Sequence, residues 1–176
     1  MLQSKRIILR AIEAEDLNHT YLKWMNDPSV NRYLETRFMP QNIRTIRAYW
    51  EKHNDDESNP WFAICTEGGK KHIGNIKLGP ISWIHQRADI SLFIGEPTCW
   101  GKGYGSEAIG LVRDWSFGEL NLQKINAGIY ANNVGSRRAF EKCGFVLEGT
   151  LKDEAISEGK RVDVWKLGLP RSMWRN

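Results

Sequence analysis

Apolar positions recur along this chain at two spacings, and each spacing predicts one kind of element. Leu17, Tyr21 and Trp24 lie three to four residues apart, on one face of a helix predicted over residues 14–25. Pro28 follows shortly afterwards and is expected to end that helix. A second helix is predicted from about residue 40 to residue 53.

Short runs of β-branched and aromatic residues predict strands in the remaining chain. Helices are also predicted over residues 103–119, with an apolar stripe through Ala108 and Val112, and over residues 133–143. The predicted strands cover residues 6–10, 61–66, 72–78, 89–94 and 123–130, and a closing hairpin within 145–167 that turns at Glu158 and Gly159.

The predicted order of elements is β-α-α-β-β-β-α-β-α-β-β, an α/β (α+β) arrangement in a single domain over residues 1–176. The strands within residues 61–94 follow one another as hairpins, the first closed by the Glu-Gly-Gly sequence of residues 67–69. A doubly wound fold would join its strands by helical crossovers, so this order argues against that class.

Charge and cysteine usage exclude several kinds of partner. The 25 lysines and arginines against 21 acidic residues give a net charge of +4, scattered except on one predicted helix, so nucleic acid is not an expected partner. The three cysteines and four histidines show no ligand spacing, which predicts a reducing compartment and no metal site. No run approaches the roughly 20 apolar residues of a bilayer span. The sequence therefore predicts a cytoplasmic protein without a membrane segment.

The loop between the strand at residues 89–94 and the helix that follows carries the most specific chemistry. Gly101, Gly103 and Gly105 lack Cβ atoms, so the backbone can turn tightly with successive N–H groups facing one concavity. The first turn of a helix also leaves N–H donors unpaired and carries a partial positive charge. Lys102 and Ser106 can add contacts. The loop is therefore predicted to bind a pyrophosphate.

Two other phosphate-binding motifs match this loop less well. A nucleoside triphosphate P-loop needs Ser or Thr after its lysine, whereas Lys102 is followed by glycine. A dinucleotide fingerprint fits Gly103, Gly105 and Ala108, but it expects an acidic residue about 20 positions onward, and the next strand ends in Tyr-Ala-Asn at residues 130–132. A dehydrogenase stays the weaker alternative.

Two segments resemble motifs of the GNAT superfamily of N-acetyltransferases. Residues 100–105, Trp-Gly-Lys-Gly-Tyr-Gly, are similar to its acetyl-CoA loop, with a tryptophan where a polar residue is usual. Residues 133–145, Asn-Val-Gly-Ser-Arg-Arg-Ala-Phe-Glu-Lys-Cys-Gly-Phe, are similar to a helix of its RimJ/RimL-like branch. The resemblance implies a mixed central sheet with helices on both faces, acetyl-CoA as co-substrate and an amine acceptor, and it leaves a homodimer open.

In the GNAT fold the pantetheine arm enters between the strand before the loop and the strand after the following helix. The resemblance places Arg137 and Lys142 near the 3′-phosphate of the coenzyme, although a solvated helix face is an equally good interpretation. The residues expected to bind acetyl-CoA are Leu92, Phe93, Ile94, Trp100, Gly101, Lys102, Gly103, Tyr104, Gly105, Ser106, Asn132, Asn133, Ser136, Arg137, Phe140 and Lys142.

Acetyl transfer needs a neutral amine, a polarised thioester carbonyl and a proton for the departing thiolate. Asp89 is the first candidate for the base, ahead of Glu35 and His85, although each is equally typical of an ordinary surface or loop-end side chain. The polarising donor is expected to be a backbone N–H near residues 93–94. Direct attack by the amine is favoured over an acetyl-cysteine, since neither Cys99 nor Cys143 has an evident base beside it.

The expected proton donor departs from the family pattern. Many members carry a tyrosine at the position of Phe140, which has no proton to give. Ser136, one turn earlier, is therefore the predicted donor and Tyr130 the reserve. A catalytically silent acyl-CoA sensor is the alternative of another class, because Phe140 removes a usual catalytic group.

The acceptor site is expected along residues 30–40, which form one wall of it in this family. The residues predicted to bind the acceptor are Tyr33, Glu35, Arg37, Phe38 and His85. Arginine suits a phosphate and an aromatic ring suits stacking, so the mixture favours a nucleotide-linked amino sugar. A ribosomal-protein α-amine and a polyamine are the alternatives, and a polyamine would want several carboxylates.

Overall fold

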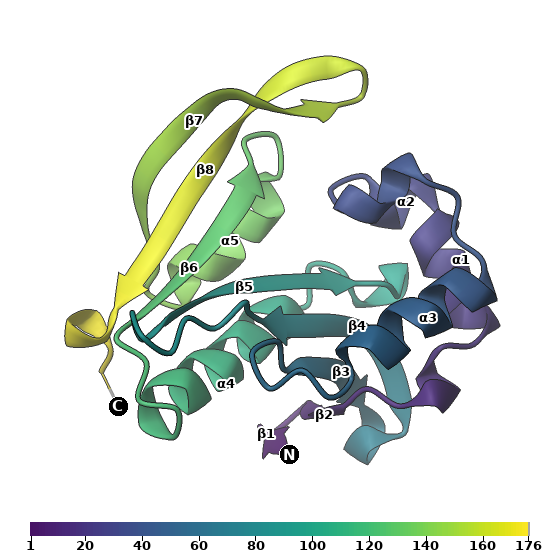
Figure 1. Cartoon of the computed structure of the whole chain (residues 1–176), viewed down its shortest axis with the longest axis horizontal. Helices are drawn as coiled ribbons and strands as arrows, with labels where there is room; N and C mark the ends of the chain where they lie inside the picture. The colour runs from purple at the N-terminus through teal and green to yellow at the C-terminus, as the bar shows by residue number, and fades with distance from the viewer. Residues whose placement is uncertain (176) are drawn as a thin grey trace.

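The computed structural model describes residues 1–175, in which one eight-stranded sheet is flanked by helices (Figure 1). The strands are β1 Leu2–Gln3, β2 Ile8–Ala11, β3 Trp61–Thr66, β4 Lys71–Leu78, β5 Arg87–Ile94, β6 Lys124–Tyr130, β7 Val146–Ser157 and β8 Lys160–Pro170. The helices are α1 His19–Asn26, α2 Pro28–Asn31, α3 Ile43–His53, α4 Tyr104–Gly118 and α5 Val134–Lys142. Short 3-10 helices are η1 Ala14–Asp16, η2 Glu35–Phe38, η3 Glu67–Gly69, η4 Pro97–Cys99 and η5 Arg171–Met173.

The sheet has the strand order β1-β2-β3-β4-β5-β6-β8-β7, and its neighbours are antiparallel except for β5 and β6. These two strands pair in parallel only where residues 87–89 lie beside residues 124–126. Beyond that short ladder they part, and Figure 1 shows β6 rising away from β5 together with β7 and β8. The expected mixed sheet is confirmed.

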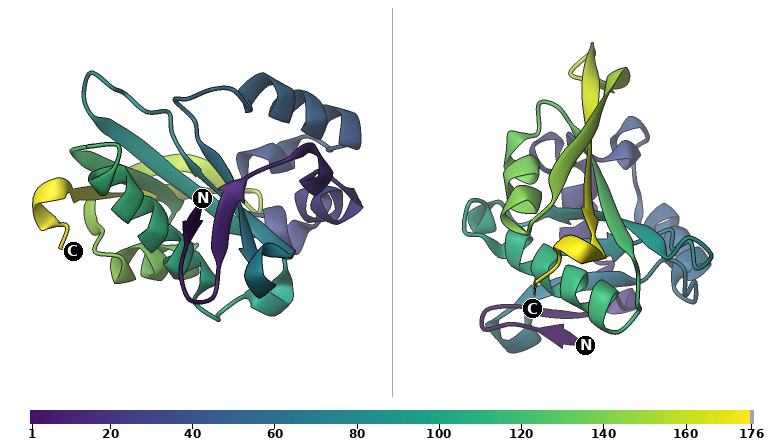
Figure 2. Two further views of the ribbon diagram at one scale, coloured as in Figure 1. Left: turned by 90° about the horizontal axis from the view of Figure 1, so that it is seen from below. Right: turned by 90° about the vertical axis from the view of Figure 1, so that its left-hand side faces the viewer.

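Two separate apolar clusters hold helices against the sheet. Ala108, Ile109 and Val112 of α4 are fully buried in the larger cluster, which also includes α5. Tyr21 and Trp24 of α1 belong to the smaller cluster under α1 and α3. In Figure 2 the α1–α3 group and the α4–α5 pair lie apart, with strands between them. The predicted apolar stripes of these helices therefore face the sheet.

The first predicted helix is wrong in its boundaries. Residues 14–16 form η1, and α1 begins only after Asn18, whose side chain accepts hydrogen bonds from the amides of Thr20 and Tyr21. The helix does end before Pro28, as expected. Pro28 also starts α2, because a proline has no N–H to lose in a first helical turn, and Asp27 caps that turn. The apolar period was correct, but these local caps determined where each helix begins.

Other boundaries shift by a few residues. The second predicted helix begins at Ile43 behind an Asn42 cap, and β8 continues to Pro170, beyond its predicted end. The turn at Glu158 and Gly159 is confirmed, with φ angles of 52° and 75°. Within residues 1–175, no helix is both long and apolar enough to cross a membrane.

Candidate functional site

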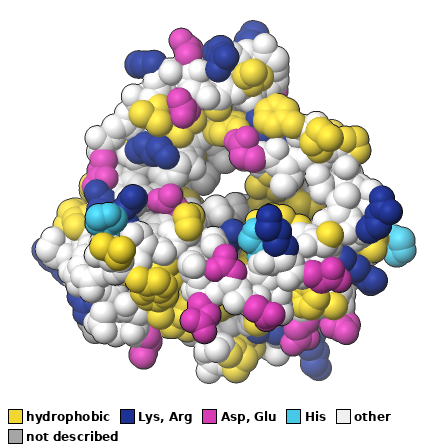
Figure 3. Space-filling view, viewed as in Figure 1, with side chains coloured by type: hydrophobic (Ala, Val, Ile, Leu, Met, Phe, Trp, Pro, Cys, Tyr) yellow, Lys and Arg dark blue, Asp and Glu magenta, His cyan; other side chains and the backbone are white. Residues whose placement is uncertain are grey.

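The parting of β5 and β6 leaves one edge of β5 without a ladder partner. Leu92, Phe93 and Ile94 pair with β4 on their other edge and are half-buried. Figure 3 shows the molecule hollowed in its middle at this place, between β6 and the α1–α2 region. Free backbone groups beside a hollow can bind an extended chain with amide groups, such as pantetheine. This geometry fits the arm of CoA.

The glycine loop adopts the backbone that its sequence predicts. Gly101 and Gly103 have left-handed φ angles of 72° and 85°. A Cβ on Gly101 would meet nothing within 4 Å, so conformation and not crowding requires the glycine. Gly103 is the N-cap of α4 and offers no side-chain cap, so the first-turn N–H groups have no side-chain partner there. The loop therefore fits a pyrophosphate.

The tryptophan at the start of this loop folds back on the sheet. Trp100 Nε1 donates a hydrogen bond of 2.8 Å to the carbonyl of Ile94, the last residue of β5. Lys102 is exposed, while Ser106 is half-buried and its carbonyl accepts a hydrogen bond of 3.1 Å from the Cys143 thiol. Burial raises the pKa of the Cys143 thiol, which disfavours a nucleophilic thiolate.

Ser136, the predicted proton donor, lies in the capped first turn of helix α5. The Asn133 side chain caps the helix by accepting a hydrogen bond of 3.2 Å from the Ser136 amide. Arg137 is engaged on its own surface, with Nε 2.7 Å from Glu141 Oε1 and its guanidinium 4.5 Å from the Trp165 ring centroid. Lys142 is exposed at the end of the helix. Arg137 is thus less available for the 3′-phosphate than the sequence indicated.

Phe140 lies in the core and is only 2% exposed. Its ring packs edge-on against Phe145 with centroids 5.0 Å apart. The position that carries a proton donor in many relatives therefore supports α5 from beneath, and the donor has to come from another residue.

Four residues from distant parts of the sequence meet at the end of β6. The phenol of Tyr130 donates a hydrogen bond to the Glu35 carboxylate. Arg37 Nη1 lies 3.3 Å from the same phenol oxygen, and the Tyr33 ring meets the Tyr130 ring edge-on at 6.2 Å. Tyr33 also donates a 3.1 Å hydrogen bond to the carbonyl of Asn132. The structure thus brings the predicted acceptor wall onto a predicted proton donor.

The environment of this phenol keeps it protonated. Partial burial raises the pKa of Tyr130, and the hydrogen bond to Glu35 raises it further by favouring the neutral phenol. Arg37 acts in the opposite direction but does not outweigh these effects. A protonated hydroxyl at neutral pH can give a proton to a departing thiolate.

A groove of about 500 Å³ opens beside this cluster. Phe38 lies under the Arg37 guanidinium, 4.0 Å from it, and is 56% exposed. Sequence reasoning missed part of this wall, because α2 was not predicted. The lining residues are Met25, Asn26, Pro28, Asn31, Arg32, Arg37, Phe38, Met39, Pro40 and Glu158.

Two other predicted site residues, Asp89 and His85, lie toward the other end of β5. Asp89 is exposed and sits opposite Asn126, at the last pair before β5 and β6 part. His85 lies before β5 in the connection from β4 and is also exposed. Since β6 rises about 3.3 Å per residue, its far end at Tyr130 is roughly 20 Å from its start. The structure therefore does not bring His85 to the Tyr130 cluster.

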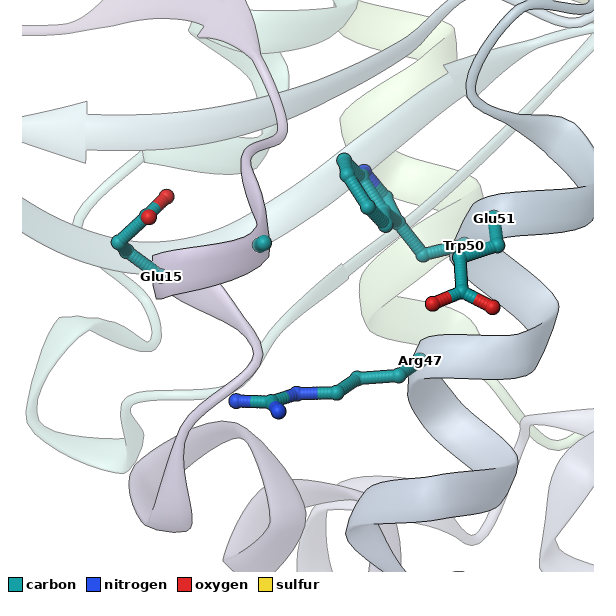
Figure 4. A pocket seen from close by; sticks show the side chains of 5 residues that line it. Glu15, Arg47, Trp50 and Glu51 are labelled. Atoms are coloured by element: carbon teal, nitrogen blue, oxygen red, sulfur yellow. The ribbon is translucent and has the colours of Figure 1, made fainter.

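A second hollow of about 230 Å³ lies between η1 and α3 (Figure 4). It is lined by Ala14 and Glu15 of η1 and by Arg47, Trp50 and Glu51 of α3. Trp50 Nε1 donates to the Ile12 carbonyl at 3.1 Å, which ties α3 to the residue that follows β2. None of these residues was a predicted site residue.

Comparisons with known proteins find one family and several similar enzymes. Residues 6–146 match the acetyltransferase (GNAT) domain. The chain is 28% identical to spermidine N(1)-acetyltransferase of Vibrio cholerae over 98% of each chain. It is 30% identical to the Escherichia coli K12 spermidine N(1)-acetyltransferase, over 91% of this chain and 83% of that one. The crystal structure of the Vibrio cholerae spermidine N-acetyltransferase with CoA and spermine superposes with a TM-score of 0.88 at 28% identity, covering 98% of this chain and 100% of that one.

Proposed function

The chain belongs to the GNAT family of acetyltransferases and is an acetyl-CoA-dependent N-acetyltransferase, and from this premise we propose that its acceptor is a primary amine of a polyamine. The observation that carries the proposal is the likeness over nearly full length to two spermidine N-acetyltransferases, one of them solved with CoA and spermine. This favours the polyamine alternative over the amino sugar that the sequence analysis placed first.

The hydrogen bonds of the Arg37 guanidinium also argue against a nucleotide-linked acceptor. Its Nη1 donates to the Leu34 carbonyl at 2.7 Å, and its Nη2 donates to the Ile156 carbonyl. Both ends of the guanidinium fork are therefore engaged by the protein, whereas a phosphate clamp needs them free. One face of Phe38, the expected stacking ring, is already occupied by Arg37.

Two carboxylates lie near the acceptor wall. Glu35 lies where the acceptor wall meets the end of β6, and Glu158 lines the adjoining groove. A polyamine could place one ammonium group near each carboxylate, because charge-assisted hydrogen bonds to carboxylates are the strong ones. The exposed methylene chain would then run along Phe38 and Met39, which are 56% and 69% exposed.

The proposed chemistry assigns each task to a residue of this chain. Acetyl-CoA supplies the activated acyl group. An alkyl ammonium with a pKa near 10.4 costs about 4 to 5 kcal/mol to neutralise at pH 7, so a base is needed. Glu35 is the proposed base, and Asp89 is the alternative, since its partner Asn126 lies four residues, about 13 Å, before Tyr130 on β6. Tyr130 and Ser136 are the proposed donors to the thiolate.

The test is an acceptor panel in which free thiol release is followed after mixing the protein with acetyl-CoA. We expect turnover with spermidine and spermine, and a product heavier by one acetyl group in mass spectrometry. Turnover only with a nucleotide-linked amino sugar or with a peptide α-amine would replace the polyamine by that acceptor. Binding of CoA without turnover of any amine would support the sensor alternative.

A further inference from the structure

A salt bridge outside the predicted site lies against the coenzyme loop. Arg6, in the connection between β1 and β2, donates from Nε to Glu107 Oε2 at 2.7 Å and from Nη1 to the Lys102 carbonyl at 3.0 Å. Its Nη2 also contacts Glu107. One side chain from the N-terminal segment therefore binds both the turn and the first part of α4.

The same guanidinium covers the side of the turn. It lies 4.9 Å from the Tyr104 ring centroid, and a Cβ on Gly103 would come within 3.4 Å of Arg6 Nη2. Glu107 is held from a second side, by the Ser4 hydroxyl and by the Arg6 amide at 3.3 Å. The loop is thus clamped between its own helix and the chain's N-terminal segment.

We propose that Arg6 is a positioning residue for coenzyme binding, which it aids by fixing the Lys102–Gly103 peptide and by neutralising Glu107. This rests on the proposed binding of the CoA pyrophosphate at residues 101–106. The peptide is planar and trans, so its C=O and N–H point in opposite directions. Holding the Lys102 carbonyl toward Arg6 therefore aims the Gly103 N–H away from Arg6, into the turn.

The charge on Glu107 explains why a cation is needed here. Glu107 stands in the first turn of α4, close to the proposed phosphate position, and its side chain is 18% exposed. A carboxylate at this position is stabilised by the helix dipole, but it repels a bound phosphate. Arg6 cancels that charge without occupying the turn, because its donors are directed at Glu107 and the Lys102 carbonyl.

The test compares CoA binding to the wild type, Arg6→Met, Arg6→Lys and Glu107→Gln by titration calorimetry. Loss of a charge-assisted hydrogen bond and of the neutralising cation should weaken CoA binding about tenfold in Arg6→Met. Arg6→Lys keeps the charge but loses the planar fork, so we expect an intermediate loss. Glu107→Gln removes the repelling charge, and combining it with Arg6→Met should recover part of the affinity.

Arg171→Met is the matched control. Arg171 donates from Nη1 to the Phe117 carbonyl at the far end of the same helix. The control removes an arginine-to-carbonyl hydrogen bond of the same kind. Phe117 lies about 20 Å from Gly103 along α4, at about 1.5 Å per residue. We expect it to lower thermal stability while leaving CoA affinity at the wild-type value.

Shortened ligands separate the proposed role from direct contact with the coenzyme. Arg6→Met should lose affinity for CoA and for dephospho-CoA by the same factor, and S-acetylpantetheine, which lacks the pyrophosphate, should show an unchanged KM as donor. Unchanged CoA binding in Arg6→Met would overturn the proposal, and so would a loss confined to CoA with its 3′-phosphate. A wild-type protein that binds no CoA would instead refute the proposed use of the loop.

Discussion

The phenol of Tyr130 hydrogen bonds to the carboxylate of Glu35, although 95 residues separate them in sequence. Tyr130 ends β6, which borders the proposed coenzyme cleft, and Glu35 begins η2, which borders the acceptor groove. The bond therefore joins the two halves of the proposed reaction site. If the acceptor ammonium binds to Glu35, as we propose, it would compete with Tyr130 for the same carboxylate.

Tyr130→Phe tests the proposed proton donor. The ring contact with Tyr33 is kept while the hydroxyl is lost, so we expect kcat to fall at least about 100-fold with little change in the KM for acetyl-CoA. Steady-state kinetics with spermidine would measure both values. Tyr49→Phe, on α3, is the control and should retain wild-type kinetics. An unchanged kcat in Tyr130→Phe would rule out this donor.

Ser136→Ala tests the competing donor on α5. The Asn133 cap acts on the Ser136 amide rather than on its hydroxyl, so the helix should stay intact. If Ser136 meets the sulfur, turnover falls while acetyl-CoA affinity stays nearly constant. Wild-type turnover in this variant would assign proton donation to Tyr130 or to solvent.

Glu35→Gln tests recognition of the acceptor's charge. Removing one carboxylate from an ammonium site should raise the KM for spermidine about tenfold and leave the KM for acetyl-CoA unchanged. Because Glu35 is also a proposed base, we expect kcat to fall as well. Glu119→Gln, at the C-cap of α4, is the control. Equal KM values for spermidine in the wild type and in Glu35→Gln would show that the polyamine binds elsewhere.

Gly101→Ala tests the backbone of the coenzyme loop. The positive φ of 72° disfavours an L side chain although the space is open, so we expect a cost of about 1–2 kcal/mol in folding or loop closure. Weaker CoA binding in calorimetry should follow. Gly110→Ala is matched to it, since that Cβ also meets nothing within 4 Å but the residue is helical. Gly110→Ala should be neutral or stabilising.

The pair of Arg10 and Asp16 predicts how stability depends on pH. Burial raises the pKa of Asp16, but two hydrogen bonds of 2.7 Å from Arg10 and one from the Glu13 amide bring the pKa below its ordinary value of 3.8. The folded-state pKa thus lies below that of the unfolded chain. The stabilisation of the folded state by ionised Asp16 is complete above about pH 4. It is lost as the pH falls through the folded-state pKa.

Asp16→Asn should remove this dependence. We expect it to lower the free energy of unfolding by about 3 kcal/mol at neutral pH, because it leaves the Arg10 charge without its partner. The difference from the wild type should shrink in acid, where Asp16 is protonated in both states. Urea unfolding at several pH values measures this difference, and a difference that stays constant down to pH 2 would contradict the assignment.

Local sequence patterns predicted most of the elements. The glycines at 101 and 103 have the positive φ angles expected of them, and the helix after them buries Ala108 and Val112 as its apolar stripe requires. Boundaries near residues 14–28 were wrong where capping by Asn18 and Asp27 outweighed the apolar period. Caps depend on a single side chain, so periodicity cannot locate them.

The amino-acid sequence by itself determined the order of the longer helices and strands, but not β1 or α2. It also determined the turn that fits a pyrophosphate and the absence of a tyrosine at residue 140. These depend on φ preferences and side-chain spacing, which act within a few residues. Only the tertiary structure decided that β5 and β6 part after residue 89, that Arg37 donates to backbone carbonyls, and that Tyr130 hydrogen bonds to Glu35. Those relationships depend on packing between segments far apart in the chain, and the spacing of residues along the chain does not encode them.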